Sequence, residues 1–142
     1  MKDDIARLAD ILETHAGQEG PLLPILHDVQ AAFGFVSEDV IRSIAEHLNL
    51  SRAEVSGVAS FYHDFRRTPE FRPTIKLCRA EACQARGSEP LAVVAGQAAG
   101  KRVRVETVYC LGLCSAGPNA MVGDKVYARL DASKVTALIE DL

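Results

Sequence analysis

The chain has 142 residues, of which 48% are hydrophobic and 25% charged, so it can bury the core of one domain or of two small ones. No apolar run approaches the ~20 residues that a membrane-spanning helix needs, and the N-terminus lacks the apolar stretch of a secretory signal. Residues 1–72 have a net charge of −5 and residues 73–142 a net charge of +2, without a dense basic stripe in either half. We therefore expect no membrane span, no nucleic-acid partner and a cytoplasmic location.

The first half of the chain predicts four short helices. Apolar residues recur with helical spacing over residues 5–12, 24–33, 38–48 and 51–65. Pro24 suits the first turn of the second helix, and Gly34 suits its C-terminal end. Ser37 is the expected N-cap of the third helix, and Ser51 with Glu54 forms the capping-box pattern that opens the fourth. Short connections between the four helices predict a small N-terminal bundle over residues 1–72.

The second half predicts a mixed sheet with helices. Residues 74–77 and 102–108 alternate like strands, residues 88–99 have the pattern of a helix, and residues 120–128 predict a hairpin on Gly123-Asp124. Ser133 is the expected cap of a last helix. The order strand–helix–strand–hairpin–helix is typical of thioredoxin-like topology. The fold class is therefore α+β, with a helical bundle followed by a thioredoxin-like α/β domain over residues 73–142.

All four cysteines lie in this second half, as the pairs Cys78-x4-Cys83 and Cys110-x3-Cys114. Each pair begins just past the end of a predicted strand, so the two loops are expected to face each other at one edge of the sheet. Four thiolates from two loops can surround a metal ion or an iron–sulfur cluster. In a reducing cytoplasm, structural disulfides are the weaker interpretation.

Spacing alone leaves both a 2Fe-2S cluster and a structural zinc open, because zinc ligands also occur as C-x2–4-C. Two features favour the cluster: the domain has enough core to fold without a metal, and the segments lack two similar C-x2-C knuckles. Four thiolates would close the coordination of a catalytic zinc. A thioredoxin-type dithiol would need C-x2-C near a helix start, which neither pair provides.

Longer motifs around the cysteines resemble a known family. The chain contains, in order, Leu23-Pro-Ile-Leu-His-Asp-Val-Gln30, Val58-Ala-Ser-Phe-Tyr-His63, Ile75-Lys-Leu-Cys-Arg-Ala-Glu-Ala-Cys83 and Cys110-Leu-Gly-Leu-Cys114 followed by Gly117-Pro118. From about residue 20 to its end the chain resembles the thioredoxin-like 2Fe-2S subunit family of NADH-linked oxidoreductases, which includes the small peripheral subunit of respiratory complex I. The stretch Cys-Arg-Ala-Glu-Ala-Cys is most similar to the gamma subunit of NAD-dependent, molybdenum-containing formate dehydrogenase.

The resemblance implies that Cys78, Cys83, Cys110 and Cys114 ligate one 2Fe-2S cluster in a non-catalytic electron-transfer subunit. It also implies that FMN, NAD and the molybdenum cofactor sit on partners, namely an FMN/NADH-binding flavoprotein subunit and a catalytic subunit with molybdenum and iron–sulfur centres. The chain itself has no G-x-G-x-x-G phosphate-binding motif. The alternatives are the equivalent subunit of respiratory NADH:quinone oxidoreductase or of an NAD-linked hydrogenase, and a zinc-stabilised interaction module.

Other residues in these motifs are expected to have supporting roles. Phe61, Tyr62 and Phe65 are candidate anchors for docking a partner, although aromatic residues more often fill a core. His27 and His63 are expected to pack or cap, because four sulfurs leave no need for a His ligand. The arginines near the cysteines could offset the charge of a reduced centre, but solvated surface positions are the more common role of such residues. These arginines are Arg79, Arg86 and Arg104.

Overall fold

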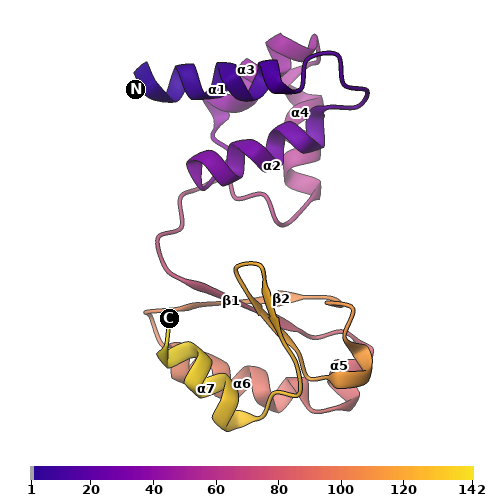
Figure 1. The fold of residues 1–142 in the computed structure, drawn as a ribbon, viewed down its shortest axis with the longest axis vertical. Helices are drawn as coiled ribbons and strands as arrows, with labels where there is room; N and C mark the ends of the chain where they lie inside the picture. Colours follow the sequence, from indigo (N-terminus) through magenta and orange to yellow (C-terminus); the bar gives the residue numbers. More distant parts are fainter. Residues whose placement is uncertain (1) are drawn as a thin grey trace. The chain divides into compact units, whose positions relative to one another are not determined.

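The structure is a computed structural model that describes residues 2–142. The chain forms two compact units, one that ends at Glu70 and one that spans Phe71–Leu142 (Figure 1). That the two halves are separate domains with a boundary after residue 72 stays a prediction of the sequence. Among the described residues, no helix has both the length and the apolar character that crossing a membrane requires.

The first unit consists of four helices, as the apolar spacing predicts. They are α1 (Lys2–Thr14), α2 (Leu22–Phe33), α3 (Glu38–Leu48) and α4 (Arg52–Phe61). The predicted local signals are confirmed: Gly34 ends α2 in the left-handed conformation with φ 80°, and the Ser37 hydroxyl accepts a hydrogen bond from the Val40 N–H. At the start of α4, Ser51 and Glu54 form both hydrogen bonds of a capping box.

The predicted length of α4 is wrong, because the helix ends at Phe61 and does not continue through Phe65. Tyr62 leaves the helical region at φ −89°, ψ 107°, and the chain turns back over the bundle. The side-chain amide of Gln30 holds this returning segment: its nitrogen donates to the Asp64 carbonyl at 2.6 Å, and its oxygen accepts from the Arg66 N–H at 2.6 Å. A contact across 36 residues therefore overrides the local helical pattern.

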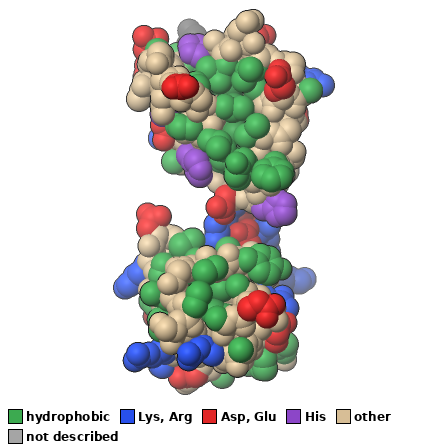
Figure 2. Space-filling model, turned by 90° about the vertical axis from the view of Figure 1, so that its right-hand side faces the viewer, with side chains coloured by type: hydrophobic (Ala, Val, Ile, Leu, Met, Phe, Trp, Pro, Cys, Tyr) green, Lys and Arg blue, Asp and Glu red, His purple; other side chains and the backbone are tan. Residues whose placement is uncertain are grey.

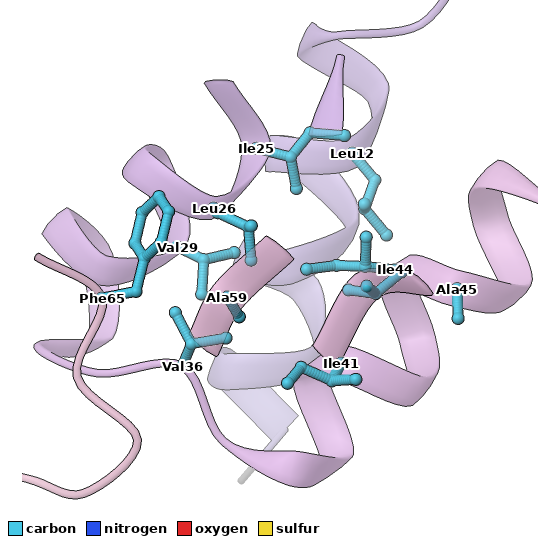
Figure 3. Packing of buried hydrophobic residues seen from close by; sticks show 11 residues of the cluster. Leu12, Ile25, Leu26, Val29, Val36, Ile41, Ile44, Ala45, Ala59 and Phe65 are labelled. Carbon is cyan, nitrogen blue, oxygen red and sulfur yellow. The ribbon is translucent and has the colours of Figure 1, made fainter. Parts of the chain in front are cut away.

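The core of the bundle is filled by aliphatic side chains from all four helices (Figure 3). The turn after α4 brings Phe65 into this core, where its ring meets the His27 ring edge-on at 5.0 Å. Phe61, in contrast, is 74% exposed, and Tyr62 is also exposed. Of the three predicted docking anchors, Phe65 is thus a core residue, while Phe61 and Tyr62 lie at the surface.

The second unit is built on a four-stranded sheet with the order β2-β1-β3-β4. Its strands are β1 (Thr74–Cys78), β2 (Arg104–Val108), β3 (Ala120–Val122) and β4 (Lys125–Tyr127). β1 and β2 are parallel, whereas β3 pairs antiparallel with β1 and with β4. The predicted hairpin on Gly123-Asp124 is confirmed, with Gly123 at φ 57°.

Two helices, α6 (Ser88–Ala99) and α7 (Ala132–Glu140), lie side by side on one face of the sheet (Figure 1). They cover the alternate strand residues that point to that face, among them Ile75, Leu77 and Ala120. Two details differ from the prediction. The N-cap of α7 is Asp131, whose carboxylate accepts from the Lys134 N–H at 2.9 Å, and not Ser133. An additional short helix, α5 (Glu81–Ala85), lies inside the first cysteine loop.

The stability of the helical unit is expected to depend on pH through His15, which follows α1. Its ring nitrogens lie 2.7 Å from the Gln18 side-chain oxygen and 2.7 Å from the Asp28 carboxylate. These hydrogen bonds, Gln18 first and Asp28 second, raise the pKa of His15 above its ordinary value of 6.5. The imidazolium therefore stabilises the fold fully below about pH 6.5, and this stabilisation is lost as the pH rises through the folded-state pKa.

The measurement is the difference in the free energy of urea unfolding between the wild type and His15→Gln, taken at pH values below and above the pKa of His15. We expect the difference to be largest at acidic pH and to shrink as the pH rises. Asp28→Asn, which removes the carboxylate and keeps the shape, should reduce the same pH dependence. A difference that is constant with pH would contradict the assignment.

Candidate metal centre

The four cysteines are delivered by the ends of two neighbouring strands. β1 ends at Cys78, which pairs in register with Val108 at the end of the parallel strand β2. Just beyond, the Arg79 N–H donates to the Val108 carbonyl at 2.9 Å, so both loops leave the sheet at the same edge. Cys83 lies in α5 of the first loop, and Cys110 and Cys114 lie in the second. The predicted meeting of the two loops is thus observed.

The sulfur atoms are arranged as two pairs. Cys110 Sγ lies 3.5 Å from Cys114 Sγ, close to the ~3.8 Å expected for two ligands of one tetrahedral ion with bonds of about 2.3 Å. The Cys78 and Cys83 thiols of the first loop interact, so that each contributes to the pKa shift of the other. Within residues 2–142, no three His, Cys, Asp or Glu side chains converge as ligands of a single ion. The printed contacts place the close pair Cys110 and Cys114 beside Cys78 of the first loop, whose sulfur accepts from the Cys110 N–H at 3.2 Å.

The two pairs differ in their access to solvent. Cys78 and Cys83 are buried, while Cys110 and Cys114 are exposed, and all four are free thiols without a disulfide. A group bound between the pairs would be enclosed on one side and reachable from solvent on the other. This asymmetry could not be read from the spacing of the cysteines.

Backbone N–H groups from the second loop point at the sulfurs. The Cys110 N–H donates to Cys78 Sγ at 3.2 Å, and the Gly112 N–H donates to Cys110 Sγ at 3.4 Å. Both donors belong to a tight loop in which Cys110 has φ 74° and Gly112 φ 81°. A left-handed conformation is uncommon for a residue other than glycine, and here it turns the Cys110 N–H toward the first loop.

These contacts and the proximity of the thiols shift the cysteine pKa values in opposite directions. Burial alone raises the pKa of Cys78, but hydrogen bonds from the backbone N–H groups of Ala80 and Cys110 outweigh it and hold that pKa below its ordinary value. Burial, and then the hydrogen bond with Cys78, raise the pKa of Cys83. The pKa of Cys114 is raised first by its hydrogen bond with Cys110 and then by the negative charge of the Cys110 thiolate.

The four cysteine sulfurs suit a bound metal group that carries several positive charges. Four sulfurs this close resist ionising together, since each thiolate disfavours the next. Metal cations reverse this preference, because they bind the thiolate and not the thiol. The cysteine loops therefore have the composition and the electrostatics of a site that is completed by bound metal.

A buried asparagine that no sequence motif pointed to ties the two loops together. The side-chain nitrogen of Asn119, a residue only 2% exposed, donates to the Leu113 carbonyl at 2.8 Å and lies 3.7 Å from Cys83 Sγ. The Asn119 carbonyl also accepts from the Cys78 N–H at 2.9 Å. The Asn119 side-chain oxygen has no hydrogen-bond partner among the described residues. The available signal in the sequence was a polar residue between Gly117-Pro118 and the predicted strand that begins at Ala120.

The three arginines expected near the cysteines have different surroundings, and for Arg104 the expectation is wrong, because it begins β2 opposite Thr74, at the other end of the strand pair from Cys78 and Val108. Arg79 forms a two-pronged ion pair with Glu89 at the start of α6, with 2.8 Å between Arg79 Nε and Glu89 Oε1. Arg104 pairs with Glu106 at 2.6 Å. Arg86 is exposed and lies beside the second loop, next to Gly117. Arg79 and Arg104 are thus held by carboxylates, whereas the Arg86 side chain packs against the cysteine loops.

The comparisons with known proteins identify the family. The thioredoxin-like [2Fe-2S] ferredoxin family model matches residues 8–142, so the chain belongs to that family, whose members carry a 2Fe-2S cluster. The predicted thioredoxin-like fold and cofactor class are thereby confirmed.

Several relatives are components of larger redox enzymes. The chain is 29% identical over 143 residues to the HndA component of the NADP-reducing hydrogenase of Solidesulfovibrio fructosivorans, covering 94% of this chain and 84% of that one. It is 31% identical over 121 residues to a component of the NADH-quinone oxidoreductase of Escherichia coli, covering 79% of this chain and 73% of that one. A solved NAD+-reducing [NiFe]-hydrogenase in the air-oxidised state matches with a TM-score of 0.72 and 26% identity. That match covers 85% of this chain but 22% of the hydrogenase chain.

Gly117 tests how tightly the second loop packs on the first. A Cβ at this position would lie 3.1 Å from Cys83 Sγ and 3.2 Å from Arg86 Cδ, although the backbone, at φ −67°, would accept any residue. We expect Gly117→Ala to destabilise the second unit by about 1–3 kcal/mol through overpacking and to lower its metal content. Chemical denaturation and metal analysis measure both.

Gly96 provides the matched control. It lies within α6 of the same unit, and a Cβ there would meet nothing within 4 Å. Gly96→Ala is therefore expected to stabilise the unit by roughly 0.5–1 kcal/mol. If both alanines had effects of the same sign, the close packing of Gly117 against Cys83 would not be the cause.

Proposed function

We propose that the chain holds one 2Fe-2S cluster through Cys78, Cys83, Cys110 and Cys114 and serves as an electron-transfer subunit of an NADH-linked oxidoreductase. The observation that carries the proposal is that two loops at one sheet edge bring the sulfurs together, with Cys110 Sγ 3.5 Å from Cys114 Sγ and the Cys110 N–H donating to Cys78 Sγ at 3.2 Å. One pair per iron is the simplest ligation of such a cluster. Membership of a 2Fe-2S ferredoxin family supports the same assignment.

When bound, the cluster would supply reversible one-electron chemistry, and the chain's own residues would set its surroundings. The N–H groups of Cys110 and Gly112 donate to ligand sulfurs and so favour the thiolate form. Cys78 and Cys83 form the enclosed side of the site. Electrons would exchange with a partner through the side of Cys110 and Cys114, which is open to solvent.

The surface beside the exposed pair is suited to protein contact. Tyr109, next to Cys110, is 76% exposed, and Leu113, next to Cys114, is also exposed. Figure 2 shows hydrophobic side chains gathered on the face of the second unit that lies on the side of α5. Exposed apolar groups around a redox site are characteristic of a docking surface.

The expected partner is a protein that binds FMN and NADH. The chain spans 24% of the alpha component of NAD-reducing hydrogenase HoxS of Cupriavidus necator, with 28% identity over 147 residues, but 84% of HndA. The same module thus occurs as part of a long chain and as a short chain. We infer that these 142 residues act as such a module, beside the part of the complex that binds FMN and NADH. A cytoplasmic location stays a prediction.

Membership of the family leaves open which kind of NADH-linked complex contains this chain. The loop Cys78-Arg-Ala-Glu-Ala-Cys83 favoured a formate dehydrogenase with a molybdenum-containing catalytic subunit. The relatives described above support the alternative better, because they belong to NADH-quinone oxidoreductases and to NAD(P)-linked hydrogenases. We therefore propose a subunit of an NADH-linked complex of this kind. Formate, hydrogen and quinone activities of the complex purified from the host through a tag on this chain decide among the three.

The cluster is tested by anaerobic purification of the chain, followed by metal analysis and visible spectroscopy. We expect a red-brown protein with about two irons per chain that dithionite bleaches. Cys78→Ser and Cys110→Ser, one from each pair, should each lower the iron content, whereas Cys→Ser variants of a zinc module would lower zinc. A colourless protein with one tightly bound zinc would refute the proposal, and so would reversible thiol oxidation without iron.

Asn119 is expected to tune the bound cluster. Asn119→Leu keeps a similar volume but removes the N–H donor near Cys83 Sγ, and loss of a hydrogen bond to a ligand sulfur lowers the reduction potential. A redox titration followed by EPR measures this shift. Asn119→Gln serves as the comparison that retains an amide, and Ser133→Ala, at an exposed position in α7, serves as the neutral control. An unchanged potential in Asn119→Leu would show that the asparagine acts only on loop stability.

A further inference from the structure

Arg86 is tied to the candidate metal centre through its backbone. It follows α5 directly, and its N–H donates to the Cys83 carbonyl at 3.1 Å. Gly87, in the left-handed conformation at φ 95°, then turns the chain into α6 without a further loop. The backbone that carries the Arg86 side chain is therefore fixed to a cysteine on one side and to α6 on the other.

The Arg86 side chain lies where the two cysteine loops meet. Its Cδ and the Sγ of Cys83 both lie within 3.2 Å of one point, which is the place that a Cβ on Gly117 would take. Gly117 belongs to the second loop and follows Cys114 by three residues. The guanidinium is bonded directly to Cδ, so its charge lies close to the Cys83 sulfur although the side chain is exposed.

Within the part of the chain that the structure describes, the Arg86 guanidinium forms no ion pair. Its charged neighbours in sequence have other surroundings. Arg79, in the first cysteine loop, pairs with Glu89. Glu81 is exposed at the opposite end of α5 from Arg86. Arg86 therefore brings to the cysteine loops a positive charge that no carboxylate of residues 2–142 neutralises.

A positive charge in this place has a specific effect on a redox centre. Four thiolates make the site negative, and each electron that a bound metal group takes up adds one more negative charge. A nearby cation without a carboxylate partner favours the more negative form, whereas a paired arginine contributes less because its partner cancels much of the field. The guanidinium stays protonated at any pH that the protein tolerates, so this effect does not depend on pH.

We propose that Arg86 compensates the negative charge of the reduced centre and thereby raises its reduction potential. The guanidinium acts through space and is not a metal ligand. Arg79 contributes less, because Glu89 neutralises it. This role of Arg86 rests on the proposed function, since it requires a cluster held by the four cysteines.

Two other roles for Arg86 lead to different outcomes. If the side chain only packed against Gly117, an uncharged side chain of similar length would replace it without an effect on the potential. If Arg86 only bound an acidic surface of a partner, the potential of the isolated chain would not depend on its charge either. The reduction potential of the chain alone therefore distinguishes charge compensation from both.

The test is a redox titration of the anaerobically purified full chain, followed by EPR. Arg86→Met keeps an unbranched stem and removes the charge, so the equilibrium constant for one-electron reduction should fall about threefold, which is roughly 30 mV. Arg86→Lys keeps the charge and should lose less than half as much. The shift in Arg86→Met should shrink as the ionic strength rises, because salt screens an exposed charge.

Lys101→Met is the matched control. It removes the same charge from an exposed position of the same unit, but Lys101 precedes β2, at the other end of the strand pair from Cys78. Its potential should equal that of the wild type. An unchanged potential in Arg86→Met would overturn the proposal, and so would equal shifts in Arg86→Met and Arg86→Lys or in Arg86→Met and Lys101→Met.

Iron content separates this outcome from the proposed function. The variants should keep the iron of the wild type, because none of them changes a cysteine. If Arg86→Met does not load iron, Arg86→Gln removes the same charge with a polar side chain and carries the same expectation. Iron in the wild type with an unchanged potential in the uncharged variants would overturn the role of Arg86 and leave the cluster assignment standing. Absence of iron in the wild type would overturn both.

Discussion

The parallel pairing of β1 and β2 is the constraint on which the candidate metal centre depends. In a parallel pair, both strands end at the same edge of the sheet, so residues that follow them meet although they are far apart in sequence. Here the register aligns Cys78 with Val108, and the ladder extends one step further through Arg79. A shift of one residue would turn the cysteine that ends β1 to the other face of the sheet. The register therefore determines whether the two pairs of sulfurs face each other.

The loops that follow this ladder are shaped around sulfur. Cys110 takes a left-handed conformation that aims its N–H at Cys78, Gly117 leaves room for Cys83, and Asn119 connects Cys83 to the second loop. Each of these contacts has a cost by itself, in backbone strain or in the burial of a polar group. Together they hold four thiols close enough to disfavour their joint ionisation, which bound metal would reverse. The arrangement is understandable as a site whose stability includes its cofactor.

Short-range signals in the sequence predict much of this fold. The caps at Ser37 and Ser51, the glycine stop at Gly34 and the turn at Gly123 each involve residues within a few positions of each other, and all four are confirmed. The fold class followed from the order of such elements.

The cysteine spacing, by comparison, limited the chemistry to two kinds of centre, and the longer motifs were needed to prefer the cluster. The features that the sequence did not predict depend on contacts between residues far apart in the chain. Gln30 holds the segment after α4 through a hydrogen bond to Arg66, and Asn119 lies beside Cys83; in both cases the two residues are 36 positions apart. The local spacing of apolar residues cannot predict such long-range contacts.

X-ray absorption spectroscopy of the anaerobically purified chain decides whether the four cysteines hold two irons. We expect absorption at the iron edge, a first coordination shell made of sulfur alone and a second shell from a neighbouring iron. Absorption by zinc without a neighbouring metal, or a first shell that contains nitrogen or oxygen from the protein, would contradict the assignment of two irons to two pairs of cysteines.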